Sequence, residues 1–352
     1  MTTNIKYYLN LDSFVKDCKE TEKKYLLLVS QRCKFYISLL RNSKIEAYGA
    51  IFPEIIFDGK NYNDGLIAYE LQENENIFLQ KDMLNLTLTE QDFENTKSII
   101  TFVDALSANK QTYLDSLFEI IGANTTVMGG GAGEIPFNRK EVIFSNEGMF
   151  IDAAILLTKT DTLKVSNEHG WEVLKNELIA TMSDKNVLKQ IDYTDVSILY
   201  KSILEEDLDK KITSLDPYLL TYPIGLVNFD KQIYIRDIIE SNSDGFNLSL
   251  PITQNSVICI LKGKKQNLLN AAYLATKNAV EGCNHKQNLV FLFECINRRL
   301  LLSDKYEEEI EKVKQIIENR ALIGAATLGE ILSEDNININ YYNNTCIVGA
   351  VC

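Results

Sequence analysis

The sequence predicts a mixed α/β protein (α+β) with two domains, each containing a mixed sheet flanked by helices. Apolar runs of strand-like composition alternate with segments whose apolar residues recur every three or four positions, as in a helix. Turn-forming segments repeatedly separate neighbouring apolar runs, which indicates hairpins and excludes an all-parallel sheet. One unit of strand, helix, strand and hairpin occurs three times along the chain.

The clearest copy of this unit spans residues 98–158. Its first strand is the apolar run at 98–103, and a helix follows over 113–121, where large apolar side chains lie three or four positions apart. The chain then passes through a glycine-rich corner at 129–133. Two further apolar runs flank the turn signal at 146–148, which predicts a β-hairpin.

Two other segments repeat the same pattern. The earlier copy has its strand, helix and hairpin at residues 25–29, 34–42 and 61–71. The later copy has its strand and helix at residues 289–295 and 304–319. In each copy a glycine-linked corner carries a Glu-Ile pair, at Glu54, Glu134 and Glu330. Such a repeat indicates related structural units, which we expect to place these corners at equivalent sheet edges.

The remaining segments complete the predicted organisation. Turn chemistry favours a hairpin over a helix within residues 171–191, and the apolar spacing at 196–208 predicts a helix. A charged run ending near Ser214 indicates a domain boundary. Further strands and a helix are predicted at residues 233–239, 247–251, 257–261 and 267–280. The predicted parts are an N-terminal helical extension at 1–22, an N-terminal domain at 23–215 and a C-terminal domain at 216–352.

Composition limits the functional classes. The formal net charge of −13 disfavours a nucleic-acid-binding surface, because such binding depends on clustered lysine and arginine. The sequence shows neither a secretory signal nor an apolar stretch of about 20 residues that could span a bilayer, so we expect a cytoplasmic protein. Seven scattered cysteines without a C-x-x-C pair predict neither a disulfide framework nor a zinc site, and most should be buried apolar residues.

Two repeated features have both functional and structural interpretations. Consecutive backbone N–H groups at residues 129–133 could cradle an anion, but the run lacks the P-loop lysine, and a close backbone approach is the favoured explanation. The three corner glutamates could form an acid-base pair. Their recurrence with the unit favours a role in its own hydrogen bonding.

Several single residues are candidates for chemistry. Arg236 and Arg298 lie in or beside apolar strands and must find an anion, either a protein carboxylate or a ligand. Cys295 ends an apolar strand and has no histidine nearby in sequence, which favours packing over nucleophilic catalysis. With only two histidines, His169 and His285, a multi-histidine metal site is excluded and no metal site is predicted. A single axial haem ligand is an open alternative for either histidine.

The order and spacing of these motifs resemble FIST-domain proteins across residues 23–350. The run from Gly129 to Glu134, followed by a hairpin, is similar to the N-terminal FIST domain. The C-terminal FIST pattern of a strand ending in Cys-x-x-Arg, a Gly-Glu corner and Asn-Thr is similar to Cys295 through Arg298, Gly329-Glu330 and Asn344-Thr345. The segment from His169 to Trp171 and the apolar setting of Arg236 also fit. Asn297 stands where the family often has glycine.

The resemblance implies a sensory input module of bacterial signalling, from a family thought to bind small ligands such as amino acids. Some members bind haem and respond to nitric oxide together with a histidine kinase. No kinase, cyclase or receiver domain is recognisable here, so we expect a stand-alone intracellular sensor that signals to a separate protein such as a histidine kinase. The alternatives are a haem-binding nitric-oxide or redox sensor and a small-molecule hydrolase using Cys295. The lack of a nucleophile with a nearby base favours a protein that is not an enzyme.

Because pockets form preferentially where domains meet, we expect the ligand between the two domains. Arginine would hold the carboxylate of an amino-acid-like anion or a haem propionate, and backbone N–H groups of the glycine run would add donors. No catalytic residue is predicted. The predicted ligand-binding residues are Gly130, Gly131, Glu134, Arg236, Cys295, Arg298, Gly329, Glu330, Asn344 and Thr345.

Overall fold

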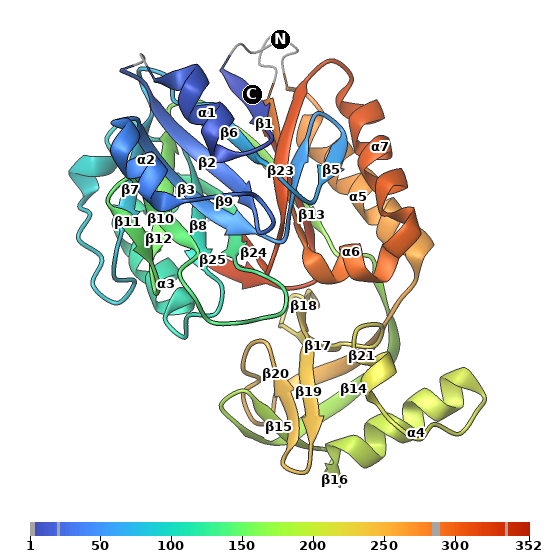
Figure 1. Ribbon diagram of the computed structural model, residues 1–352. Coiled ribbons are helices and arrows are strands. Elements are labelled where there is room, and N and C mark those ends of the chain that lie inside the picture. Colours follow the sequence, from blue (N-terminus) through green and yellow to red (C-terminus); the bar gives the residue numbers. More distant parts are fainter. Residues whose placement is uncertain (1–3, 20–21, 284–288, 335–336) are drawn as a thin grey trace.

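The computed structural model describes residues 4–19, 22–283, 289–334 and 337–352, and it confirms the predicted mixed α/β class. Four sheets are built from these residues. Three of them pack together into what we call the large body. The fourth, with helix α4 (Val196–Leu208), forms a small body from residues 171–263 (Figure 1).

The first sheet of the large body contains the parallel pair β2 and β3, which are joined by helix α2 (Ile37–Ser43). Six of the seven residues of β2 are buried, which explains the continuous apolar run in the sequence. Across the sheet the strands are β1 (Ile5–Tyr8), β6 (Leu66–Glu70), β2 (Lys24–Ser30), β3 (Glu46–Phe52), β10 (Ile143–Ser145) and β11 (Gly148–Phe150).

The second sheet repeats this plan around the parallel pair β8 and β9, which helix α3 (Lys110–Ile121) connects. Every residue of β8 is buried, as its unbroken apolar run predicts. Across the sheet the strands are β25 (Asn338–Tyr342), β24 (Glu330–Glu334), β9 (Thr126–Ala132), β8 (Ser98–Asp104), β12 (Ala154–Lys159) and β7 (Asn76–Gln80).

The third sheet is built on the parallel pair β22 and β23, joined through α6 (Ile296–Leu302) and α7 (Tyr306–Ile317). Helix α7 lies within the helix predicted at 304–319 and buries an apolar stripe of Tyr306, Ile310, Val313 and Ile317. Helix α5 (Lys265–Val280) packs beside α7 on the same side of this sheet (Figure 1). Across the sheet the strands are β13 (Leu163–Glu168), β26 (Cys346–Val351), β22 (Leu289–Cys295), β23 (Ala321–Thr327), β4 (Glu54–Phe57) and β5 (Lys60–Tyr62).

Each unit donates its hairpin to a neighbouring sheet. The hairpin β4–β5 follows β3 but pairs with β23 of the third sheet. Likewise β10–β11 follows β9 and pairs with β3, and β24–β25 follows β23 and pairs with β9. The exchange is cyclic, so every sheet depends on two units. The threefold repeat and the predicted hairpin around residues 146–148 are confirmed. The hairpin predicted at 61–71 is wrong, because β5 pairs with β4 whereas β6 pairs with β1 and β2. The exchange of hairpins was not visible in the sequence.

Aromatic side chains from all three units meet at the centre of the large body. Phe102 of β8 contacts Phe52 of β3 and Phe293 of β22 edge to face, with ring centroids 5.1 and 5.2 Å apart. All three side chains are buried. Edge-to-face contact is a favoured geometry for aromatic rings, so these contacts stabilise the packing where the three sheets converge.

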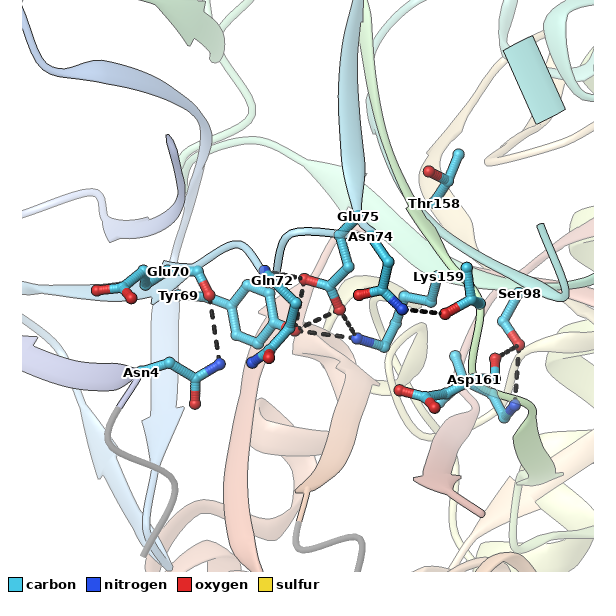
Figure 2. Close-up of polar contacts among 12 residues, drawn as sticks. Asn4, Tyr69, Glu70, Gln72, Asn74, Glu75, Ser98, Thr158, Lys159 and Asp161 are labelled. Atoms are coloured by element: carbon cyan, nitrogen blue, oxygen red, sulfur yellow. Dashed lines mark hydrogen bonds and ion pairs between the residues drawn. The ribbon is translucent and has the colours of Figure 1, made fainter. Parts of the chain in front are cut away.

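A buried polar network fastens the first sheet to the second (Figure 2). Lys159 of β12 is ion-paired with Glu75, and both side chains are almost fully buried. Lys159 also donates to Tyr69 Oη of β6 at 2.9 Å, and Tyr69 donates to Glu75 at 2.7 Å. The backbone N–H of Gln72 donates to the second Glu75 oxygen at 2.9 Å. Burial of such a charge pair is tolerated because its polar atoms are mutually satisfied.

The small body is an antiparallel sheet with α4 beside it. Helix α4 begins at Val196 because the Asp195 side chain caps it, accepting hydrogen bonds from two backbone N–H groups. The predicted hairpin within residues 171–191 is confirmed by the pairing of β14 with β15. Across the sheet the strands are β18 (Ile233–Arg236), β17 (Ile224–Val227), β21 (Val257–Gly263), β14 (Trp171–Asp184), β15 (Val187–Ile191), β20 (Gly245–Leu248) and β19 (Ile238–Asn242), with β16 (Thr194–Asp195) on β15.

Three local features differ from or extend the sequence analysis. Residues 5–8 form strand β1 rather than helix, and α1 begins only at Leu11, where Asn10 caps it. A disulfide joins Cys283 and Cys352, which the cysteine spacing did not indicate. Strands β14 and β21 pair across the predicted boundary at 215, so the sheet of the small body draws on both halves, and the domain division stays a prediction. No helix in the described ranges has the length and apolar character that crossing a membrane requires.

Candidate functional site

A cavity of about 340 Å³ lies between the large body and the small body, and we call it the interbody cavity. The large body contributes the loop after β8, the start of α3, the junction of β22 with α6, and Tyr341 of β25. The small body contributes Asp237 and residues near the ends of β15, β19 and β20. A ligand in this cavity would therefore contact both bodies.

The unit repeat explains why polar residues collect beside this cavity. Ser30, Asp104 and Cys295 are each the last residue of the first parallel strand of a unit. Their backbone N–H groups make equivalent hydrogen bonds, to the carbonyls of Gly65, Ala153 and Thr345 at 3.0, 3.0 and 3.1 Å. In the second and third units, the carboxyl ends of these strands, β8 and β22, open on the interbody cavity.

Asp237 links the small body to what we call the third-unit corner, which consists of Cys295, Glu330, Asn344 and Thr345. Its carboxylate accepts a hydrogen bond from the Asn344 side chain, and its backbone N–H donates to Ser249 Oγ at 3.0 Å. Burial raises the pKa of Asp237 to about 6, although hydrogen bonds from Asn344 and Asn297 favour its charged form. A carboxyl with this pKa changes charge close to neutral pH.

Glu330 is the buried carboxyl of the same corner. It accepts hydrogen bonds from Thr327 Oγ1 at 2.7 Å, from the Thr345 backbone N–H at 3.1 Å and from Thr345 Oγ1 at 2.8 Å. Burial raises the pKa of Glu330 to about 8, and the nearby charge of Asp237 adds to the shift. This carboxyl organises the corner from within rather than lining the cavity.

Cys295 lines the interbody cavity beside these two carboxyls. Burial raises its thiol pKa well above the ordinary value, and the negative charges of Glu330 and Asp237 raise it further. Backbone N–H groups of Asn297 and Asn344 only partly offset this effect. Because the thiolate is the nucleophile, the environment of Cys295 opposes activation.

Lys110 brings a positive charge to the cavity wall. Its ammonium donates to the Ser107 carbonyl at 3.1 Å and lies 5.4 Å from the centre of the Tyr341 ring. Burial lowers the pKa of Lys110, and Asp104 opposes that shift. Within the described part of the chain, no carboxylate oxygen lies within 4.0 Å of this ammonium. Lys110 is therefore available to an anionic ligand.

Residues 129–132 of the glycine run belong to strand β9, and the run does not form an open anion cradle. Gly130 pairs with Glu330 across the β9–β24 ladder, and a side chain on Gly130 would meet Thr327. The N–H of Gly131 donates to the Gly329 carbonyl at 2.8 Å. A Cβ on Gly131 would lie 2.1 Å from Tyr341 Oη. Close packing against neighbouring atoms therefore explains these glycines, in agreement with the close backbone approach that the sequence favoured.

The corner glutamates are not equivalent in space. Glu54 and Glu330 are each the first residue of a donated hairpin, in β4 and β24. Glu134 instead precedes its hairpin by nine residues and forms an ion pair with Lys140. The insertion between β9 and β10 removes Glu134 from the equivalent position, so it does not join the predicted cluster.

The two candidate arginines differ sharply. Arg298 is fully buried and ion-paired with Glu309, and it also donates to the carbonyls of His169 at 2.6 Å and Leu268 at 3.0 Å. These bonds occupy it structurally, and it does not line the interbody cavity. Arg236 lines a separate cavity. The predicted residues that the structure brings together are Gly130, Gly131, Cys295, Gly329, Glu330, Asn344 and Thr345.

The haem alternative finds little support in the surroundings of His169. Its Nδ1 accepts a hydrogen bond from the Trp171 backbone N–H at 2.9 Å, and burial together with Arg298 lowers its pKa to about 4. His169 lines a cavity of about 280 Å³ whose wall includes Asn167, Glu168 and Lys231. A haem requires a large apolar slot, so these residues do not fit one. His285 lies outside the described residues.

Sequence reasoning missed Asp237, Asn297, Lys110 and Tyr341. A signal existed for Asp237, which follows Arg236 directly in an apolar strand, and for Asn297 within the Cys-x-x-Arg segment. Lys110 and Tyr341 carry no local signal, because their role depends on how the hairpins are exchanged. Among the described residues, no cluster of three metal-ligating side chains is found.

Comparison with known families covers most of the chain. The FIST N domain matches residues 42–194 and the FIST C domain matches residues 199–333. A comparison with curated proteins found no match. The two matches follow each other in the order expected from the motifs at residues 129–134 and 295–345. The protein therefore belongs to the FIST-domain family, whose domains serve sensing and signalling.

Proposed function

We propose that this protein is a non-enzymatic intracellular sensor that binds a small ligand in the interbody cavity and signals to a separate protein. The sensory role of FIST domains supports the general class. The position of the cavity supports the mechanism, because a ligand that contacts both bodies can shift their relative position. A histidine kinase is the partner class that the family resemblance implies.

The ligand we propose is an amino acid or a closely related zwitterion. One observation carries this proposal: the cavity is lined by the cation Lys110 from one body and the carboxyl of Asp237 from the other. Lysine would hold the ligand carboxylate, while Asp237 and the Ser249 hydroxyl would accept from its ammonium group. Leu106, Phe137 and Ile239 add apolar surface for a side chain.

The hydrolase alternative is less well supported than sensing. A Cys295 nucleophile would need a lowered pKa or an adjacent base, whereas burial and two carboxyls raise its thiol pKa. His169, the histidine within the described ranges, lines another cavity. Substrate turnover that is lost in a Cys295→Ala variant would contradict the proposal.

Calorimetric titration with the proteinogenic amino acids tests this function. We expect at least one to bind saturably and to raise the unfolding temperature, because it binds only the folded state. Lys110→Gln should weaken binding about tenfold or more, since a hydrogen bond to a charged group contributes about 1.5–3 kcal/mol. Lys16→Gln, at an exposed position on α1, is the matched control. Equal affinity in the two variants would contradict the assignment of Lys110.

A further inference from the structure

A second cavity of about 670 Å³ lies between the small body and strand β25. Its wall is formed by the β17–β18 hairpin, by the turn that precedes β21, and by Asn338 and Asn340. Both β18 and β25 are edge strands of their sheets. Arg236 is the charged residue among the lining side chains, so we call this the Arg236 cavity.

Arg236 is a half-buried guanidinium with few partners. Among the described residues, its buried Nε has no hydrogen-bond partner, and Nη1 donates only to the neighbouring Ile235 carbonyl at 3.1 Å. No carboxylate of the described residues lies within 4.0 Å of it. Burial lowers its pKa to about 10, which still leaves it charged at neutral pH. A charge in this setting is costly unless an anion joins it.

Arg298 shows how the same protein neutralises a buried arginine with its own carboxylates. Its Nη atoms donate to Glu309 and to two backbone carbonyls, and its Nε, which makes no hydrogen bond among the described residues, lies 3.6 Å from a carboxylate oxygen of Glu294. Arg236 has the same planar fork, and no carboxylate among the described residues receives it. That fork matches a carboxylate through two parallel hydrogen bonds.

The other walls of the Arg236 cavity narrow the ligand class. Gln254 and Ser256 offer polar side chains on one side, and Asn340 does so on the other. Leu226 and Val257 add apolar surface to the lining. A bare inorganic anion would leave that apolar surface in water. A small organic acid would use both the arginine and the apolar wall.

We propose that the Arg236 cavity is a second ligand site, separate from the interbody cavity, in which Arg236 binds the carboxylate of a small organic acid. This site does not require the proposed sensory function. The Arg236 cavity is nevertheless connected to the interbody cavity, because the consecutive residues Arg236 and Asp237 line one cavity each. An anion on Arg236 would reduce the positive potential at Asp237, so occupancy of the two sites should be coupled.

Titration with butyrate, followed by NMR at the arginine Nε–Hε groups, tests the proposal. The Arg236 signal, assigned by its loss in Arg236→Gln, should shift saturably with butyrate and should not shift with the neutral isostere butyramide. Arg236→Gln should weaken butyrate binding at least about tenfold, and Arg236→Lys should weaken it as well because the fork is lost. Arg32→Gln, an exposed arginine, should leave the affinity unchanged.

Two further variants separate this site from the interbody cavity and from a folding defect. Lys110→Gln should leave butyrate binding at Arg236 intact. Asn340→Asp, nearly isosteric, should weaken binding while keeping the arginine, because it adds a carboxylate to the wall of the cavity. The proposal is overturned if Arg236→Gln binds butyrate as tightly as the natural protein, if binding depends on Lys110 alone, or if the response is never saturable.

Discussion

The side-chain amide of Asn344 donates a hydrogen bond to the carboxylate of Asp237, and this contact joins the large body to the small body beside the interbody cavity. Asn344 has a left-handed backbone conformation, with φ at 60°, in the turn before β26. Asp152 has a comparable conformation, with φ at 52°, in the corresponding turn before β12. The unit repeat thus supplies the turn, and the third unit alone uses it to reach Asp237.

A double-mutant cycle should detect this link. Asp237→Ala and Asn344→Gly remove the two partners, and glycine tolerates the left-handed conformation of residue 344. We expect a coupling free energy of about 1.5–3 kcal/mol in denaturant unfolding, the range for a hydrogen bond to a charged group. Strictly additive changes in the free energy of unfolding would show that the contact does not hold the two bodies together.

The raised pKa of Glu330 predicts how stability depends on pH. The unfolded carboxyl has the ordinary pKa of 4.5, whereas the folded one has a pKa of about 8. The folded state therefore binds more protons between these values, and its free energy of unfolding falls as pH rises, by up to about 1.4 kcal/mol per pH unit. Glu330→Gln removes this decline, so its stability relative to the natural protein should grow from pH 4.5 to about 8.

Asp237→Asn provides an internal comparison for that experiment. The pKa of Asp237 rises only from 3.8 to about 6, so its relative gain should end near pH 6. Unfolding at a series of pH values measures both variants. A Glu330→Gln difference that stays constant with pH would mean that this carboxyl is charged in the folded protein throughout the range.

The buried pair of Lys159 and Glu75 should be sensitive to loss of one partner (Figure 2). Lys159→Met leaves the Glu75 carboxylate buried without its cation, and we expect a loss of about 3–5 kcal/mol in the free energy of unfolding. The double variant Lys159→Met, Glu75→Gln should recover part of it. Equal stability of Lys159→Met and the exposed control Lys16→Met would contradict this role.

Gly131→Ala should disturb the interbody cavity without touching a ligand. The new methyl would displace the Tyr341 hydroxyl, which donates to the Leu328 carbonyl at 2.8 Å. Tyr341 and Leu328 both line the interbody cavity. We expect a loss of about 1–3 kcal/mol in the free energy of unfolding, together with weaker ligand binding. Gly148→Ala, where the nearest atom is 3.4 Å away, is the matched control in both measurements.

The local secondary structure was predictable from the sequence because apolar periodicity depends on residues that are close together in the chain. The runs at 25–29, 98–103 and 289–295 became the central strands β2, β8 and β22, and the repeat predicted their common plan. The exchange of hairpins depends on contacts between distant segments. No local pattern could therefore show that β24 pairs with β9, or that Tyr341 reaches the loop after β8.

The candidate site was predictable to the extent that the unit itself determines it. Cys295, Glu330, Asn344 and Thr345 lie together because they all belong to the third-unit corner. Arg298 was a reasonable candidate, but its partner Glu309 comes from α7 and was hidden within a charged helical segment. Asp237 was missed because its partner lies 107 residues away in the sequence.

Hydrogen–deuterium exchange with and without the amino acid that binds best tests whether a ligand bridges the two bodies. A ligand in the interbody cavity should slow exchange in two segments together, residues 105–110 of the large body and residues 237–249 of the small body, since residues of both segments line the cavity. The matched variant Lys110→Gln should show neither change at the same ligand concentration. Protection confined to one body would contradict the proposed interbody site, because the ligand would then bind without bridging the two bodies.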